Sequence, residues 1–186
     1  MKQVRCLVFN VFDTLLPDLD KLATIRGSLA RVILGYKDAK GLQLKRGVNF
    51  SPDYDRITIG PGCYINSGCV FAAWSPITIG ANVFIGAQSM IWTGTHDVGD
   101  PKQRCGRGYS QPISVGDGCW IGVRCTIHKD IGSGCVVDTS STVITPIADN
   151  SHVFGNPARV LKKLPVAEDS ETLGADNYDV PLKVGQ

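Results

Sequence analysis

Apolar residues recur at every sixth position through the middle of the chain. They form four triplets with a step of six inside each: Ile59, Ile65 and Phe71; Ile79, Ile85 and Ile91; Val115, Ile121 and Ile127; Ile131, Val137 and Val143. An amphipathic helix would repeat its apolar stripe at 3.6 residues, so the period excludes a helix here. It is typical of short strands joined by tight corners, three strands to a coil. The pattern predicts an all-β solenoid of stacked three-sided coils.

Small residues occupy two further positions of the repeat. Glycine directly follows the apolar residue in six repeats, where it permits a sharp corner. Five of the seven cysteines lie four residues after the apolar residue: Cys63, Cys69, Cys119, Cys125 and Cys135. A free cysteine behaves as a small buried hydrophobic residue, so we expect these five to pack inside the coils. Cys6 and Cys105 fall outside the pattern.

The flanks of the repeat predict a helical cap and a tail. Leu22, Ile25, Leu29, Val32 and Ile33 have helical spacing, which predicts a helix over roughly 18–34 that covers the first coil. The apolar N-terminal stretch is interrupted by Asn10 and Asp13 and has no cleavage site, so it does not read as a signal peptide. We expect a cap over 1–45, coils over 46–155, and a segment over 156–186 that leaves the coils and ends in an acidic tail.

Composition narrows the possible partners. The chain has 186 residues, of which 43% are hydrophobic and 19% charged, as in one globular domain. A net charge of +2 and 8% aromatic residues give no indication of a nucleic-acid partner. No apolar run reaches the roughly 20 residues of a membrane span, so we expect no membrane insertion. These features predict a cytoplasmic protein.

One long insertion interrupts the repeat. The strand at Ile91 ends near Thr95, and the next triplet begins only at Val115, which leaves a loop over 97–112. Long loops in compact domains are often functional. His96 opens this loop, and histidine suits acid–base chemistry near neutral pH.

Four short motifs carry a resemblance to a known family: YIN at 64–66, TGTH at 93–96, WIG at 120–122 and GNPAR at 155–159. Over roughly residues 46–163 the sequence resembles the hexapeptide-repeat O-acetyltransferases of the galactoside and maltose acetyltransferase type, including polysaccharide-modifying relatives. The resemblance implies a left-handed parallel β-helix and a homotrimer with active sites between subunits. It further implies acetyl-CoA as co-substrate, no metal, and a small-molecule or glycan acceptor.

The same resemblance implies roles for individual residues. His96 matches the catalytic base, and Asn66 matches an asparagine that positions the acceptor. Trp74 stands where some relatives carry an acid that helps to bind the acceptor, and its indole is suited to stack on a sugar ring. Separately from the resemblance, Tyr109, Arg104 and Arg107 are candidate acceptor contacts because they lie in the long loop. The acceptor group is a hydroxyl, although an amine would be served by the same base.

Contacts to acetyl-CoA are implied at Trp120, Val123, Thr139, Thr145, Arg159 and Lys162. Arginine suits a phosphate because its donors form a fork. Two departures from the family bear on this groove. The segment from Ile127 to Ile131 is two residues short, and Ile144-Thr145-Pro146 replaces a Thr-Lys-Asp that relatives often carry.

Two other classes of function compete with acetyl transfer. A carbonic-anhydrase-like metalloenzyme can share the solenoid, but zinc would need three histidines with two close in sequence. His96, His128 and His152 are the three histidines, and they contain no close pair. A non-enzymatic solenoid used for assembly is the second alternative, and it would need neither a histidine at the groove nor a basic cluster.

Overall fold

The coordinates are a computed structural model that describes residues 2–50 and 53–166. Two helices precede the strands: α1 (Lys2–Leu15) and α2 (Ala23–Ile33), with the short 3-10 helix η1 (Asp20–Leu22) between them and η2 (Tyr54–Arg56) further on. The acidic tail expected over 167–186 lies outside the described residues.

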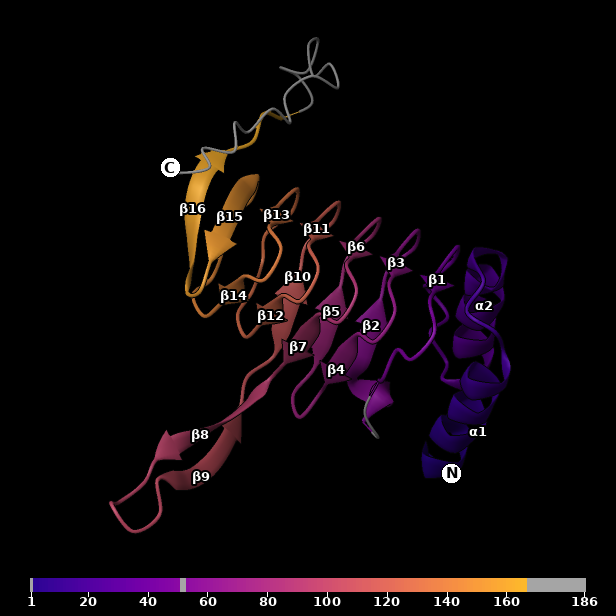
Figure 1. The fold of residues 1–186 in the computed structure, drawn as a ribbon, viewed down its shortest axis with the longest axis horizontal. Coiled ribbons are helices and arrows are strands. Elements are labelled where there is room, and N and C mark those ends of the chain that lie inside the picture. Colours follow the sequence, from indigo (N-terminus) through magenta and orange to yellow (C-terminus); the bar gives the residue numbers. More distant parts are fainter. Residues whose placement is uncertain (1, 51–52, 167–186) are drawn as a thin grey trace, which may run out of the picture.

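Short strands form three sheets that the chain visits in turn, and they pair in parallel except for the last two strands, at 151–155 and 158–163, which pair antiparallel. Sheet A consists of β1 (Gln43–Leu44), β3 (Tyr64–Ile65), β6 (Phe84–Ile85), β11 (Trp120–Ile121), β13 (Val136–Val137), β15 (Ser151–Gly155) and β16 (Ala158–Lys163). Sheet B consists of β4 (Val70–Ala72), β7 (Met90–Trp92), β12 (Thr126–Ile127) and β14 (Thr142–Val143). Sheet C consists of β2 (Ile57–Ile59), β5 (Ile77–Ile79) and β10 (Ile113–Val115). Each pass through sheets C, A and B makes one coil (Figure 1).

The repeat positions form the core. All twelve apolar residues predicted from the period of six are buried, and each strand pairs in register with its equivalent one coil away, as Ile85 does with Ile121. Gly86 shows why a corner needs glycine, because a Cβ there would lie 2.6 Å from the backbone carbon of Gly122. The prediction of a mostly β repeat with helices at its N-terminal end is confirmed.

The repeat cysteines do more than fill space. Each thiol donates a hydrogen bond to a backbone carbonyl of the next coil, as Cys69 does to Gly86 at 3.2 Å and Cys119 to Gly132 at 2.9 Å. Ser89 occupies the same repeat position and bonds the carbonyl oxygen of Gly122 at 2.7 Å. The position therefore takes a small side chain, and where that side chain is a cysteine or Ser89 it also donates to the corner of the next coil.

Burial makes these thiols poor nucleophiles. It raises the pKa of Cys69 to about 11 and that of Cys119 to about 12, and it also raises the pKa of Cys63. Because the thiolate is the reactive form, we expect Ellman's reagent at pH 8 to modify exposed Cys105 rapidly in the native protein. The five repeat cysteines should react only after denaturation, and Cys105→Ser should remove the rapid phase. Native reaction of the repeat cysteines at the rate of Cys105 would contradict this packing.

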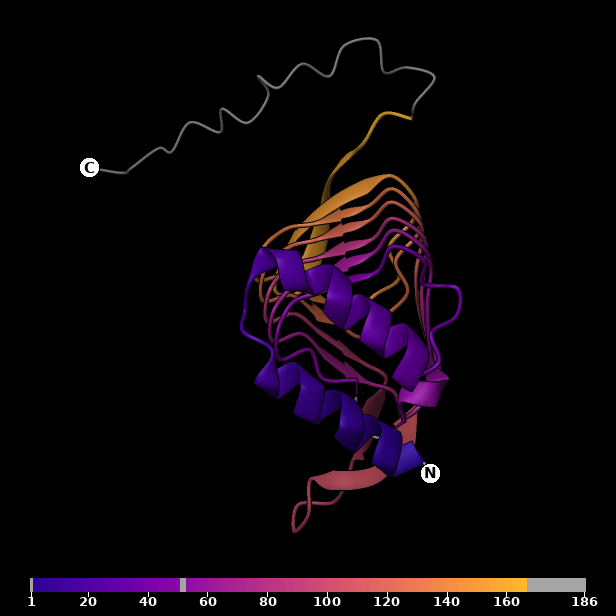
Figure 2. The ribbon, with the colours of Figure 1, turned by 90° about the vertical axis from the view of Figure 1, so that its right-hand side faces the viewer.

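The N-terminal cap differs from the prediction in two respects. The spacing predicted one helix within the cap over 1–45, whereas a second helix, α1, lies beside α2 across the end of the coils (Figure 2). The predicted helix over 18–34 exists as η1 and α2, but Val32 is 82% exposed and Ile25 is also exposed.

Leu29 and Ile33 of the predicted stripe do pack against the core, and small residues and one ion pair complete the inner face of α2. A Cβ on Gly27 would lie 1.8 Å from the carbonyl oxygen of Leu42, so only glycine lets the helix backbone approach the first coil this closely. The neighbouring Arg26 is buried, and its Nε donates to Asp13 of α1 at 2.9 Å. Close backbone approach and this pair therefore supply the part of the contact that helical spacing had given to Ile25 and Val32.

Candidate active site

The long insertion is a β-hairpin rather than an irregular loop. Strands β8 (Gly94–Val98) and β9 (Cys105–Ser110) pair antiparallel and project from the side of the coils, between β7 and β10 (Figure 1). The hairpin starts where sheet B ends and the chain turns toward sheet C, a position called here the B–C corner. The opposite end of sheet B, where the chain arrives from sheet A, is called the A–B corner.

His96 is oriented by its own hairpin. Its Nδ1 lies 3.1 Å from the carbonyl oxygen of Gly106. Because a carbonyl can only accept, Nδ1 carries the proton in this contact and the neutral ring has its lone pair on Nε2. The register of the two strands shifts between His96 and Val98, and such bulges redirect side chains near active sites. His96 is exposed, so its Nε2 is available to a bound substrate.

Trp74 packs against His96. The two rings are edge to face, with centroids 6.2 Å apart and planes at 80°. The indole also lies over Gly94, where a Cβ would be 2.5 Å from the indole Cε3. Trp74 remains 44% exposed. The base of the hairpin thus presents an imidazole and a partly exposed aromatic face side by side.

Hydroxyl groups fix the hairpin to the coil beneath it. The hydroxyls of Ser75 and Ser110 are 2.7 Å apart. Thr93 accepts from the backbone N–H of Ser75 at 2.9 Å and donates to the carbonyl oxygen of Ala72 at 3.1 Å. These bonds join the ends of the hairpin to the residues around Trp74, which keeps the Trp74–His96 pair in place.

The arginines predicted as acceptor contacts are held within the hairpin. Arg104 donates to the carbonyl oxygen of Gly99 at 3.4 Å, and Arg107 lies 3.5 Å from the carboxylate of Asp97. The second pair is exposed, and exposed ion pairs of this kind contribute little to stability.

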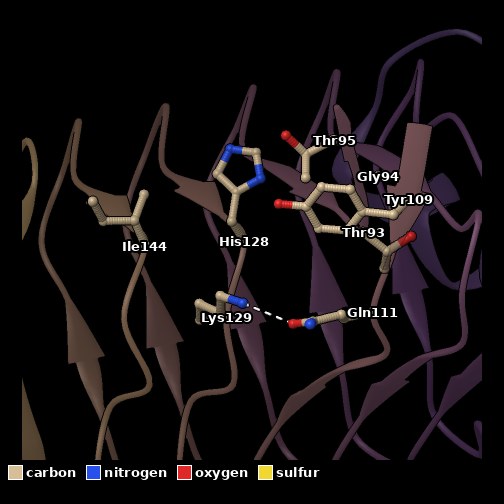
Figure 3. A pocket seen from close by; sticks show the side chains of 8 residues that line it. All are labelled: Thr93, Gly94, Thr95, Tyr109, Gln111, His128, Lys129 and Ile144. Carbon is tan, nitrogen blue, oxygen red and sulfur yellow. Dashed lines mark hydrogen bonds between the residues drawn. The ribbon is translucent and has the colours of Figure 1, made fainter. Parts of the chain in front are cut away.

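A cavity of about 300 Å³ lies at the B–C corner (Figure 3). Tyr109 contributes to it, together with Thr93, Gly94, Thr95, Gln111, His128, Lys129 and Ile144. Tyr109 pairs with Thr95 across the hairpin, whereas His96 pairs with Gly108 and does not line the cavity. Since side chains alternate along strands, Tyr109 and His96 belong to opposite faces of the hairpin.

Aromatic side chains form a ladder on the outside of sheet A. The rings of Tyr64 and Phe84 stack with centroids 4.7 Å apart, and Trp120 follows Phe84 in register on the next strand. Phe84 and Trp120 line a shallow hollow of about 400 Å³. Trp120, predicted to contact the cofactor, is 43% exposed there.

The other predicted site residues are spread over different parts of the chain. Val123 and Thr139 lie at the A–B corner with Asn66, whose side-chain oxygen accepts from the backbone N–H of Ser67 at 2.8 Å. Thr145 lies at the B–C corner, one coil beyond Lys129. Arg159 and Lys162 lie on β16. Within one chain the structure brings Trp74 and His96 together and leaves Asn66 at the other end of sheet B.

His128 and Lys129 are site residues that sequence reasoning did not select. His128 matched no catalytic position, but its Nδ1 lies 3.2 Å from the carbonyl oxygen of Trp92 and its side chain lines the cavity. The one available signal was the shortened segment from Ile127 to Ile131, which places these residues at the corner. Across the described ranges, no cluster of three or more potential metal ligands occurs. Nor does any helix in those ranges have the length and apolarity of a membrane span.

Comparisons with known proteins assign the family. A family model described as the hexapeptide repeat of succinyl-transferase matches residues 76–100 and 112–145. A candidate acetyltransferase of Staphylococcus aureus strain MRSA252 is 33% identical over 135 residues, which cover 71% of this chain and 68% of that protein. The chain therefore belongs to the hexapeptide-repeat acetyltransferase family.

Two solved structures share the fold. A galactoside acetyltransferase in complex with coenzyme A matches with a TM-score of 0.76 and 25% identity, covering 94% of this chain and 86% of that chain. A maltose O-acetyltransferase from Clostridium difficile 630 matches with a TM-score of 0.68 and 26% identity, covering 87% and 85%. The chain spans only 60–65% of the length of several other curated relatives.

Proposed function

We propose that the protein transfers an acetyl group from acetyl-CoA to a hydroxyl group of a sugar or sugar-like acceptor. The observation that carries this proposal is the orientation of His96. Its Nδ1–H is bound to the carbonyl oxygen of Gly106, so the basic Nε2 is free and exposed at the base of the hairpin, beside Trp74. A neutral hydroxyl is a poor nucleophile, and a base at this place removes its proton as it attacks.

The reaction then balances with His96 as the single proton carrier. Nε2 takes the hydroxyl proton while the acceptor oxygen bonds to the thioester carbonyl carbon. The tetrahedral intermediate expels the CoA sulfur, which receives the proton from the imidazolium. The bond to Gly106 holds the ring in one tautomer through both steps, and it stabilises the ring most when the ring is charged.

Trp74 and Asn66 are proposed to bind the acceptor. The exposed indole offers an apolar face for the carbon–hydrogen side of a sugar ring, and Gly94 lets that indole approach the hairpin. The amide of Asn66 can both donate to and accept from sugar hydroxyls. A galactoside and a maltose acetyltransferase are among the similar structures, which supports a carbohydrate acceptor.

We further propose a left-handed winding and a homotrimer with sites between subunits. Asn66, Val123 and Thr139 lie at the A–B corner, while Trp74 and His96 lie at the B–C corner. These groups can form one site if the A–B corner of one subunit faces the B–C corner of the next. A closed three-fold ring makes this contact three times. The unpaired cysteines among the described residues are consistent with a reducing, cytoplasmic location.

Acetyl-CoA is proposed to bind between the A–B corner of one subunit and the B–C corner of the next. The similar galactoside acetyltransferase is in complex with coenzyme A, which supports this co-substrate. Trp120, Val123, Thr139 and Thr145 would contact the pantetheine arm. Arg159 and Lys162 would contact phosphate groups. The guanidinium of Arg159 is exposed, donates to the carbonyl oxygen of Ala158 at 2.9 Å, and faces no carboxylate in the described part of the chain.

We expect Arg159→Ala to raise the KM for acetyl-CoA about 10- to 100-fold with little change in kcat, because a charge-assisted contact contributes about 1.5–3 kcal/mol. Release of CoA in the presence of a sugar panel measures the rate. A dephosphorylated CoA should show a smaller penalty than acetyl-CoA itself.

Lys102→Ala in the hairpin is the control, and it should leave the KM unchanged. An unchanged KM in Arg159→Ala would place the phosphate contact elsewhere. No binding of acetyl-CoA by the wild-type protein would instead favour the non-enzymatic assembly function.

A further inference from the structure

The shortened B–C corner places a lysine without a counter-charge in the cavity of about 300 Å³. The chain passes from Ile127 to Ile131 through only His128, Lys129 and Asp130. Asp130 is engaged elsewhere, since its carboxylate accepts from the backbone N–H of Ser114 at 2.7 Å and from the Ser114 hydroxyl at 3.0 Å. His128 and Lys129 therefore remain as the groups that this corner presents to the cavity.

Lys129 is half-buried, and its ammonium group is hydrogen-bonded to a neutral side chain. Its Nζ donates to Oε1 of Gln111 at 2.8 Å, a contact that spans the cavity wall (Figure 3). Of the ammonium's three donors, this bond uses one. No carboxylate lies within ion-pair distance of Lys129 anywhere in residues 2–50 and 53–166. A partly buried charge without a counter-charge is unfavourable, and a bound anion would compensate it.

Two hydroxyl donors point into the same cavity. The hydroxyls of Tyr109 and Thr95 both line it, and neither has a hydrogen-bond partner among the described residues (Figure 3). The Nδ1–H of His128 is occupied by the carbonyl oxygen of Trp92, so this group does not donate into the cavity. The lining therefore combines one cation with two hydroxyl donors.

We propose that this cavity binds an anionic oxygen group, a carboxylate or a phosphate, carried by one of the two substrates. The inference rests on the proposed acetyl transfer and deepens it. Thr95 directly precedes His96, but the cavity lies on the face of the hairpin opposite the histidine, so a substrate anchored there by its anionic group extends around the base of the hairpin to reach His96. Carboxylate and phosphate oxygens both suit an ammonium flanked by hydroxyl donors. The acceptor and acetyl-CoA are the two possible sources of that group.

The test is calorimetric titration of the whole protein with three ligands: D-glucuronate, its uncharged analogue D-glucose, and acetyl-CoA. We expect Lys129→Met to weaken binding of one of the two anionic ligands about 10- to 100-fold and to leave glucose unchanged. Loss confined to glucuronate assigns the site to a charged acceptor. Loss confined to acetyl-CoA assigns it to a phosphate of the cofactor.

Two variants serve as matched controls. Lys129→Arg keeps the charge and should retain most of the affinity, whereas Lys102→Met removes a lysine at the tip of the hairpin and should change nothing. Wild-type affinity of Lys129→Met for both anions, or no binding of either anion by the wild type, would overturn the inference. Because binding is measured without turnover, Lys129-dependent binding of glucuronate without acetyl transfer would contradict the proposed function and leave the anion site intact.

Discussion

His96→Ala should reduce kcat by about 10²- to 10⁴-fold, the usual contribution of a general base. The structure gives the reason, since Nδ1 is bound to the carbonyl oxygen of Gly106 and Nε2 is left as a free basic atom at the base of the hairpin beside Trp74. Binding of acetyl-CoA and the melting temperature should stay close to those of the wild type, because the ring is exposed and packs against few neighbours. Steady-state kinetics and calorimetry on the same preparations measure these quantities.

His96→Asn separates the chemical role from the structural one. Its amide can still donate toward Gly106 and preserve the hairpin, but it offers no base, so the loss of kcat should equal that of alanine. His152→Gln is the control, because His152 lies on β15 and contacts Asp138 at 3.5 Å, away from the hairpin. His128 is unsuitable as a control since it lines the cavity.

The pH dependence follows from the same proton transfer. The base must be unprotonated to act, so wild-type kcat/KM should fall as the pH falls and the imidazole takes up a proton. Both His96 variants should lose that acidic limb. Full kcat in His96→Asn would show that another group takes the proton, and His128 would then be the first residue to test.

The coils could be predicted in detail from the sequence because their packing is periodic. Each strand of the repeat has two or three residues and buries one apolar side chain per face of the coil. The buried positions can therefore be identified directly from the sequence. Ile121 is buried between Ile85 and Val137 on neighbouring coils, as the step of six requires. The burial of the cysteines was predictable for the same reason. Their hydrogen bonds to carbonyl groups of the next coil were not predictable.

The helical cap shows where such reasoning fails. Helical spacing identified α2 and the inward positions of Leu29 and Ile33, but it also placed Ile25 and Val32 inside, because spacing does not show that the contact depends on backbone approach. Gly27 and the buried Arg26–Asp13 pair determine how α2 sits on the first coil, and neither has an apolar signature. Val32, which spacing placed inside, is instead among the most exposed apolar side chains.

The candidate site was predictable only in part. His96 was identifiable because its position at the end of a strand and the start of an insertion is local in sequence. The cavity could not be identified from the sequence. Lys129 and Gln111 are 18 residues apart and come into contact only because the chain completes one coil between them. The separation of Asn66 from His96 also needed the structure, because only the order of the sheets shows that they occupy opposite ends of sheet B.

The most direct test of a site shared between subunits is complementation of two defective variants. His96→Ala and Asn66→Ala, carrying different affinity tags, are coexpressed, and trimers with both tags are purified. If His96 and Asn66 of one site come from neighbouring chains, every mixed trimer contains one junction where both residues are intact. We expect recovery of about one-third of wild-type acetyl transfer, far above either variant alone. Mixed trimers no more active than the single variants would contradict it.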